Sequence, residues 1–120
     1  MNIYKYIAGL ALCISFQAFA WQINFVNNSD GEIIARIIYA APGICSLEER
    51  IIAPGGFANV DTRLCCTTDI ELYVRSGKAV GKVHKFATPR AGINMTCANI
   101  RVNIFNTADN NISADVNLYW

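Results

Sequence analysis

The sequence predicts an all-β protein, a small antiparallel β-sandwich of immunoglobulin-like size with about seven strands and two disulfides. Short segments that alternate apolar and polar residues recur along the chain, clusters of turn-forming residues separate them, and no stretch of ten residues has convincing helical periodicity. The 120 residues are 53% hydrophobic and 16% charged. This length and composition indicate one globular domain and exclude disordered and fibrous proteins.

The first segment, residues 1–20, has the features of a secretory signal peptide. Lys5 supplies a positive charge, an apolar stretch follows, and Ala18-Phe19-Ala20 matches the small-x-small pattern that precedes a cleavage site. We therefore expect a cleaved signal peptide over 1–20 and a single β-sandwich domain over 21–120, in a periplasm or secreted. Two alternatives are an uncleaved membrane anchor, for which the stretch is short, and a lipoprotein modified at Cys13.

The domain is expected to begin with two strands. Trp21–Phe25 alternates apolar and polar residues and precedes the turn-forming cluster Asn27–Gly31. Glu32–Ala40 has apolar residues on both parities, which indicates a central strand or a strand with an apolar outer face. Ser46–Arg50 is compatible with one helical turn, because a serine in the capping position is followed by a glutamate three residues later.

Further strands follow in the rest of the chain. Phe57–Val60 resumes an extended pattern after a Pro-Gly-Gly turn, and Leu64–Arg75 shows the cleanest alternation of all. Val80–Phe86 is expected to return beside that strand as a hairpin, and Ile100–Ile104 with Ile112–Trp120 is expected to form a second hairpin. Short strands joined by turns throughout favour a sandwich or a small barrel.

Cysteine usage predicts a covalent framework. Four cysteines remain after the first segment, at Cys45, Cys65, Cys66 and Cys97, and an even number in an exported domain indicates two disulfides. A zinc site is less favoured because the cysteines lack the short C-x₂-C spacing. A bridge between adjacent cysteines would be strained, so each must reach a distant partner. Because neighbours in an extended chain point to opposite faces, we expect Cys65 to pair with Cys97 and Cys66 with Cys45.

One pair of segments resembles a known group of proteins. Ile23–Ser29, followed later by Ile52–Gly56, resembles the start of many small exported β-sandwich modules, the thaumatin-like proteins among them. The resemblance covers less than a third of the chain and consists of strand and turn residues. Because the chain lacks the dense cysteine framework of true thaumatin-like proteins, the resemblance implies a β-sandwich and no particular function.

The residues that could perform catalysis form no recognisable set. His84 is the sole histidine, and nothing in the spacing of the serines and carboxylates places a nucleophile and an orienting acid beside it. Adjacent Glu48 and Glu49 are more typical of a solvated turn than of a glycosidase pair. One histidine and four oxidised cysteines leave few ligands for a transition metal. We expect no enzymatic activity, no cofactor and no metal, with a small hydrolase that uses His84 as the weakest alternative.

A stretch of 16 residues, 75–90, contains five basic side chains and no acidic one. These residues are Arg75, Lys78, Lys82, Lys85 and Arg90. They could form a patch that binds an anionic lipid or a glycan, although lysines on an edge hairpin also serve to prevent aggregation between sheets.

Strand parity predicts a second candidate surface. If Ile23, Ile33, Leu72, Ile104 and Leu118 face the core, another set of residues faces outward. That set is Ile34, Arg36, Ile38, Tyr73, Arg101, Phe105 and Tyr119. Tyrosine, phenylalanine and arginine on one surface are typical of protein-binding hot spots, provided that no loop or second sheet covers them.

These observations predict an exported, non-enzymatic module that binds another macromolecule, most simply a protein that it recognises as an inhibitor or an immunity protein would. The alternative is a surface-active protein that docks on an anionic membrane or glycan through the basic hairpin. A formal net charge of +1 gives no general attraction to nucleic acid, and no apolar run long enough to span a membrane follows the first segment. Sequons at Asn27, Asn94 and Asn111 matter only where the source glycosylates.

Overall fold

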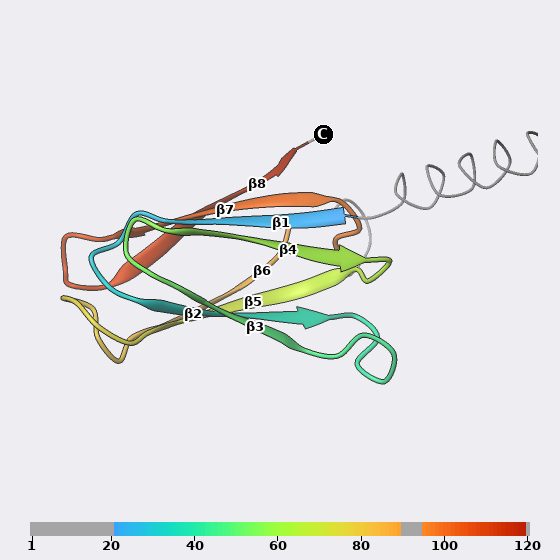
Figure 1. The fold of residues 1–120 in the computed structure, drawn as a ribbon, viewed down its shortest axis with the longest axis horizontal. Helices are drawn as coiled ribbons and strands as arrows, with labels where there is room; N and C mark the ends of the chain where they lie inside the picture. Colours follow the sequence, from blue (N-terminus) through green and yellow to red (C-terminus); the bar gives the residue numbers. More distant parts are fainter. Residues whose placement is uncertain (1–20, 90–94, 120) are drawn as a thin grey trace, which may run out of the picture.

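The computed structural model describes residues 21–89 and 95–119, which form eight strands and no helix (Figure 1). The strands are β1 (Trp21–Asn27), β2 (Ile33–Tyr39), β3 (Glu48–Ile52), β4 (Phe57–Arg63), β5 (Thr67–Val74), β6 (Val83–Ala87), β7 (Asn99–Asn106) and β8 (Ile112–Tyr119). The predicted all-β fold is therefore confirmed. The signal-peptide prediction for 1–20, the basic residue Arg90 and the sequon at Asn94 lie outside the described residues.

The strands form two four-stranded sheets that stack as a sandwich (Figure 1). One sheet has the order β4-β1-β7-β8 and the other has the order β3-β2-β5-β6. Among the described strands, five pairings are antiparallel, as predicted, and the pairing of β1 with β7 is parallel. Both predicted hairpins are present, because β6 pairs with β5 and β8 pairs with β7.

The core lies between the sheets and consists of the inward residues of the alternating strands. Ile23 and Phe25 of β1, and Ile100, Val102 and Ile104 of β7, are fully buried in the first sheet. The inward residues of β2 and β5 meet them from the second sheet, and they are Ile33, Ala35, Ile37, Ile70, Leu72 and Val74. The core assignments made from parity are confirmed for four of the five residues, whereas Leu118 is partly buried and packs against the core.

Asn27, at the end of β1, is a polar residue in the core. Its side chain is fully buried and its amide nitrogen donates hydrogen bonds to the carbonyl oxygens of Gly31 (2.9 Å), Ile52 (3.1 Å) and Ala53 (3.2 Å). Its amide oxygen accepts hydrogen bonds from the backbone nitrogen (3.1 Å) and the hydroxyl (2.6 Å) of Ser29. The residue therefore joins the β1–β2 turn to the β3–β4 turn, and its burial leaves the sequon inaccessible in the folded domain.

One local prediction is wrong. Residues 48–50, expected within a helical turn, belong to β3. This strand pairs with β2, with Ile52 opposite Ile33 and Glu49 opposite Arg36. An isolated helical turn of five residues is marginal in water, whereas pairing with β2 satisfies the backbone of the same residues.

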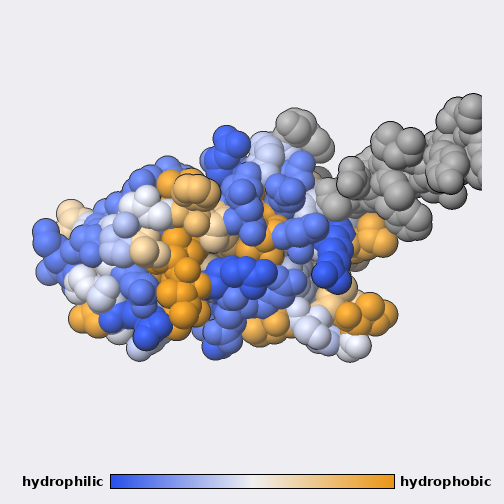
Figure 2. Space-filling model, viewed as in Figure 1, coloured by the Kyte–Doolittle hydropathy of each residue, from blue (hydrophilic) through white to orange (hydrophobic). Residues whose placement is uncertain are grey.

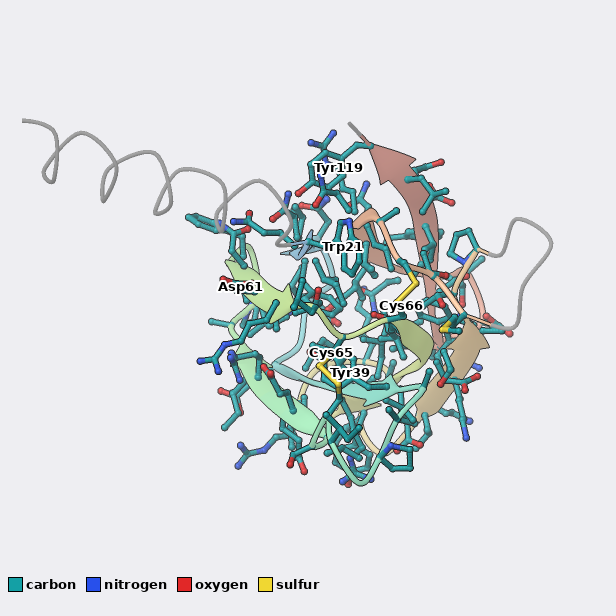
Figure 3. All side chains as sticks on the ribbon, turned by 90° about the vertical axis from the view of Figure 1, so that its right-hand side faces the viewer. Trp21, Tyr39, Asp61, Cys65, Cys66 and Tyr119 are labelled. Atoms are coloured by element: carbon teal, nitrogen blue, oxygen red, sulfur yellow. A yellow bond between two sulfur atoms is a disulfide. The ribbon has the colours of Figure 1, made fainter. Side chains whose placement is uncertain are left out.

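The four cysteines form two disulfides, as predicted, at the end of the sandwich where β1 begins (Figure 3). The pairing that we expected is wrong, because Cys45 is bonded to Cys65 and Cys66 is bonded to Cys97. Figure 3 shows that Cys65 lies beside Tyr39, in agreement with the hollow that both residues line.

Two local irregularities explain why the parity argument failed. In β5, Asp69 pairs with Ile38 while Thr67 pairs with Tyr39, so Thr68 is an extra residue and the alternation reverses there. Before β5 the chain is not extended either. The backbone nitrogen of Cys65 donates a hydrogen bond to the carbonyl of Thr62, and Arg63 has a positive φ of 56°.

Candidate functional site

The outer face of the β3-β2-β5-β6 sheet carries the most organised surface in the described part of the chain. The register places four apolar residues in one line across the four strands, because Ile51 pairs with Ile34, Ile34 with Tyr73, and Tyr73 with Val83. We call these four residues the apolar row. Ile51, Tyr73 and Val83 are 62%, 42% and 54% exposed, so most of this row faces solvent.

A line of four charged residues runs beside the apolar row. Arg36 pairs with Glu49 on one side and with Glu71 on the other, and Glu71 pairs with Lys85. We call Glu49, Arg36, Glu71 and Lys85 the charged row; its signs alternate from β3 to β6. The guanidinium of Arg36 lies 3.4 Å from the Glu49 carboxylate and 3.6 Å from that of Glu71. Lys85 forms no ion pair or hydrogen bond with the residues that the structure describes.

A hollow of about 300 Å³ lies where the two rows meet, between β2 and β5. Its lining consists of Ile34 and Tyr73 from the apolar row and Arg36 and Glu71 from the charged row. The Nε atom of Arg36 is buried beside it without a hydrogen-bond partner in the described chain. An apolar wall next to paired charges suits a side chain from another macromolecule better than it suits a chemical reaction.

The candidate protein-binding residues predicted from parity separate into two groups. Ile34, Arg36, Ile38 and Tyr73 lie together on β2 and β5. Arg101, Phe105 and Tyr119 lie on β7 and β8, on the outer face of the other sheet, where the Arg101 guanidinium stacks 4.8 Å from the centre of the Tyr119 ring. Parity cannot distinguish the two outer faces, because it does not specify which sheet a strand joins.

Sequence reasoning missed half of the apolar row and most of the charged row. Ile51 and Val83 of the apolar row, and Glu49 and Glu71 of the charged row, were not among the predicted residues of this face, and Lys85 was assigned only to the basic stretch. Four of these five residues lie on the edge strands β3 and β6, and Glu71 lies on β5. The only sequence signal that could have found them is the register between strands, which a single sequence does not specify.

The predicted basic stretch is interspersed with acidic residues from other segments. Arg75 forms an ion pair with Glu32 (3.1 Å), and the backbone nitrogen of Lys78 donates to the Asp30 carboxylate (3.1 Å). Asp109 lies near Lys82; a hydrogen bond from Thr107 and, more weakly, the charge of Lys82 lower the pKa of its carboxyl. The fourth acidic neighbour, Glu71, lies opposite Lys85 in the register of β5 and β6 without forming an ion pair with it. In the folded domain, acidic side chains from other segments therefore offset part of the positive charge of this stretch.

His84 lies on the inner side of the edge strand β6. It pairs with Leu72, it is half-buried, and its ring centre lies 5.5 Å from that of Phe86. No carboxylate or hydroxyl group of residues 21–89 and 95–119 forms a hydrogen bond with it. Within the same residues, no group of three or more histidine, cysteine, aspartate or glutamate side chains is placed to hold a metal ion.

A second hollow, of about 280 Å³, lies at the disulfide end and is lined by Tyr39, Glu48, Arg63 and the Cys45–Cys65 disulfide, among others. Tyr39 is 4% exposed, and its hydroxyl has no hydrogen-bond partner among the described residues. Burial, with a smaller contribution from the neighbouring Glu48 carboxylate, raises the pKa of Tyr39 to about 12. The tyrosine therefore stays protonated near neutral pH and is not a nucleophile there.

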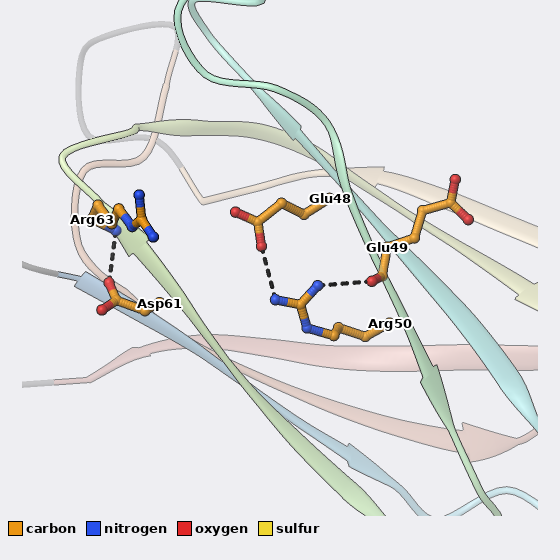
Figure 4. A network of polar contacts seen from close by, with 5 residues as sticks. All are labelled: Glu48, Glu49, Arg50, Asp61 and Arg63. Atoms are coloured by element: carbon orange, nitrogen blue, oxygen red, sulfur yellow. Dashed lines mark hydrogen bonds and ion pairs between the residues drawn. The ribbon is translucent and has the colours of Figure 1, made fainter.

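The charged groups around the second hollow are held by their own neighbours (Figure 4). Arg50 contacts the Glu48 carboxylate at 3.1 Å and donates to the Glu49 carbonyl at 2.8 Å. The Asp61 carboxylate accepts a hydrogen bond of 2.7 Å from the backbone nitrogen of Arg63. These contacts rigidify the ends of β3 and β4 and place no base beside a nucleophile.

Apolar residues also reach the surface elsewhere. Figure 2 shows a band of them among hydrophilic residues on the side of the molecule that carries β3 and β4, and the large apolar residues exposed on those two strands are Ile51 and Phe57. Ile44, in the β2–β3 loop, is 88% exposed. Single exposed apolar residues are common, so the ordered row across the second sheet is the more informative feature.

The described residues contain no helix long and apolar enough to cross a membrane. Neither a known protein family nor a functionally curated protein matches the chain. Among solved structures, the chain is similar to the NMR structure of a protein from Eubacterium rectale, with a TM-score of 0.56 and 6% sequence identity over 84% of this chain and 91% of that one. At this identity the similarity concerns the fold alone.

Proposed function

We propose that this protein is an exported, non-enzymatic module that binds another protein through the outer face of the β3-β2-β5-β6 sheet. The observation that carries the proposal is the apolar row, which spans all four strands and faces solvent beside the charged row. A line of apolar side chains of this length is an unusual feature on the outer face of a small sandwich, and burial against a partner would remove it from water.

The composition of the face supports protein recognition. Tyr73 and Arg36 are of the residue types that contribute most to binding at protein interfaces, and both border the hollow between β2 and β5. The charged row would orient the partner and exclude proteins with the wrong charge pattern. A membrane surface requires a concentrated positive charge, whereas this face carries three acidic residues and only two basic ones. The acidic residues are Glu49, Asp69 and Glu71, and the basic ones are Arg36 and Lys85. The predicted basic stretch also has acidic neighbours.

Two disulfides in a small domain are compatible with an extracellular or periplasmic location, since cytosolic conditions keep most thiols reduced. The signal-like first segment points to the same compartments. Export to a periplasm or secretion is therefore part of the proposal.

The test is affinity capture from the native cell envelope at physiological salt, with the purified protein immobilised. We expect one protein to be retained by the wild type, and Tyr73→Ala to weaken its binding about 30-fold, the usual cost of truncating a central aromatic residue. Tyr119→Ala is the matched control, because it removes the same side chain from the opposite face. Its binding should be unchanged.

Three results would contradict the proposal. Equal loss of binding in the two tyrosine variants would place recognition elsewhere or indicate a general defect in folding. Salt-sensitive binding to anionic liposomes, with no protein retained, would favour the basic hairpin instead. Loss of a hydrolytic activity in a folded His84→Ala variant would show that the protein is an enzyme.

A further inference from the structure

We infer that the protein recognised by this face is a second copy of the same chain, and that two copies stack their β3-β2-β5-β6 sheets about a two-fold axis parallel to the strands. This inference rests on the proposed function and names the partner. It follows from the order in which the register arranges charged and apolar residues across the sheet.

The charged row is complementary to its own reverse. From β3 to β6 its signs are negative, positive, negative and positive, at Glu49, Arg36, Glu71 and Lys85. A two-fold axis that runs parallel to the strands between β2 and β5 reverses this order in the second copy. Glu49 then faces Lys85 of the second copy and Arg36 faces Glu71 of the second copy, so every opposed pair has opposite charges. An isologous contact of this kind requires only one self-complementary patch.

The same rotation keeps the apolar row against itself. An axis parallel to the strands leaves the position along each strand unchanged, so the apolar row of one copy covers the apolar row of the other. Ile34 faces Tyr73 of the second copy, and Ile51 faces Val83 of the second copy. Stacked sheets are rotated by about 30°, so the alignment is best near the axis, at Arg36, Glu71, Ile34 and Tyr73.

The charges of the charged row favour this contact over repulsion. The four members of the charged row sum to zero, so two copies do not repel each other through it. Lys85 has no ionic partner among the described residues, and the side chains of Arg36 and Glu49 are 42% and 47% exposed. These groups can therefore interact with a second copy without first breaking a buried ion pair.

The size of the face predicts a weak dimer. Four strands spaced about 4.8 Å apart, each about 20 Å long, cover roughly 400 Å², which is about half of the area that one partner contributes to a standard interface. We therefore expect association that depends on concentration, and the experiment must extend to high concentrations.

The test is sedimentation of the purified, oxidised protein between about 1 µM and 1 mM, a range in which weak complexes form. We expect the wild type to approach twice the monomer mass. Arg36→Glu and Glu71→Arg each place like charges opposite one another across the axis, so each variant alone should associate at least about tenfold more weakly. An equimolar mixture of the two variants restores opposite charges at all four positions, and its association should recover.

Arg101→Glu is the matched control, since it makes the same charge change on the other sheet, and it should dimerise as the wild type does. Far-UV circular dichroism of each variant distinguishes loss of association from loss of folding. A wild type that stays monomeric at the highest concentration would overturn the inference, and so would a mixture that associates no better than its components.

The two proposals can fail separately. A monomeric wild type that captures a different protein through Tyr73 would refute the second copy as partner and leave the proposed function intact. A monomeric wild type that captures nothing would refute both.

Discussion

Replacing Asn27 with alanine should destabilise the domain more than any other single polar substitution that the structure suggests. The residue lies in a turn-rich polar segment, yet its side chain is 0% exposed. It connects two turns that are about 25 residues apart in the chain, because it donates to the carbonyls of Gly31, Ile52 and Ala53.

The expected loss follows from the number of hydrogen bonds. The two amide hydrogens of Asn27 are shared among three carbonyl acceptors, and its amide oxygen accepts two hydrogen bonds from Ser29. This corresponds to about four hydrogen bonds with a net value of about 1 kcal/mol each, so Asn27→Ala should lower the free energy of unfolding by about 4 kcal/mol. That is a large fraction of the stability of a domain of this size.

The assay is urea unfolding at constant pH, followed by far-UV circular dichroism. With a typical m-value of about 1.5 kcal/mol/M, the urea midpoint should fall by about 3 M. Asn27→Asp keeps the two acceptor contacts and loses the donors, and it should be at least as unstable because a carboxylate would face three carbonyl oxygens. Asn28→Ala is the control, since its side chain contacts Asn103 at the exposed surface.

A loss below about 1 kcal/mol in Asn27→Ala would refute this reasoning, because buried carbonyls without donors should cost more than that. An equal loss in Asn28→Ala would also refute it. In that case the destabilisation would come from the turn as a whole and not from the buried amide.

Three further predictions concern stability. Replacing either disulfide with two serines should cost about 3 kcal/mol for the bridge that spans 20 residues and about 4 kcal/mol for the one that spans 31, measured by urea unfolding. Gly31→Ala should unfold the domain or shift its melting temperature strongly, because the new Cβ would lie 1.8 Å from the Ser76 carbonyl oxygen, whereas Gly43→Ala meets nothing within 4 Å and should be neutral. Folding raises the pKa of Tyr39 from 10.0 to about 12, so the folded state holds this proton more tightly. The resulting stability is complete below pH 10 and disappears as the pH rises toward 12; urea midpoints across this range should fall less in Tyr39→Phe than in the wild type.

The strands and their inward faces could be predicted because alternation is a local property. Ile23, Leu72 and Ile104 point inward wherever their strands are placed, since side chains in a strand change face at every residue. The same rule failed at Cys65 and Cys66, where an extra residue at Thr68 reverses the alternation. A β-bulge depends on how the strand pairs with its neighbour. The local sequence before or after the bulge therefore does not show that the side chains change face.

The sequence by itself determined that this is a sandwich of short strands with a covalent framework, because periodicity, turn residues and cysteine number are all properties of the chain alone. Only the tertiary structure decided which outward residues share a surface. Ile34 meets Ile51 and Tyr73, and Tyr73 meets Val83, through pairings between segments that are about 10 to 40 residues apart. The apolar row, the charged row and the burial of Asn27 all depend on such distant pairings, and no local pattern specifies them.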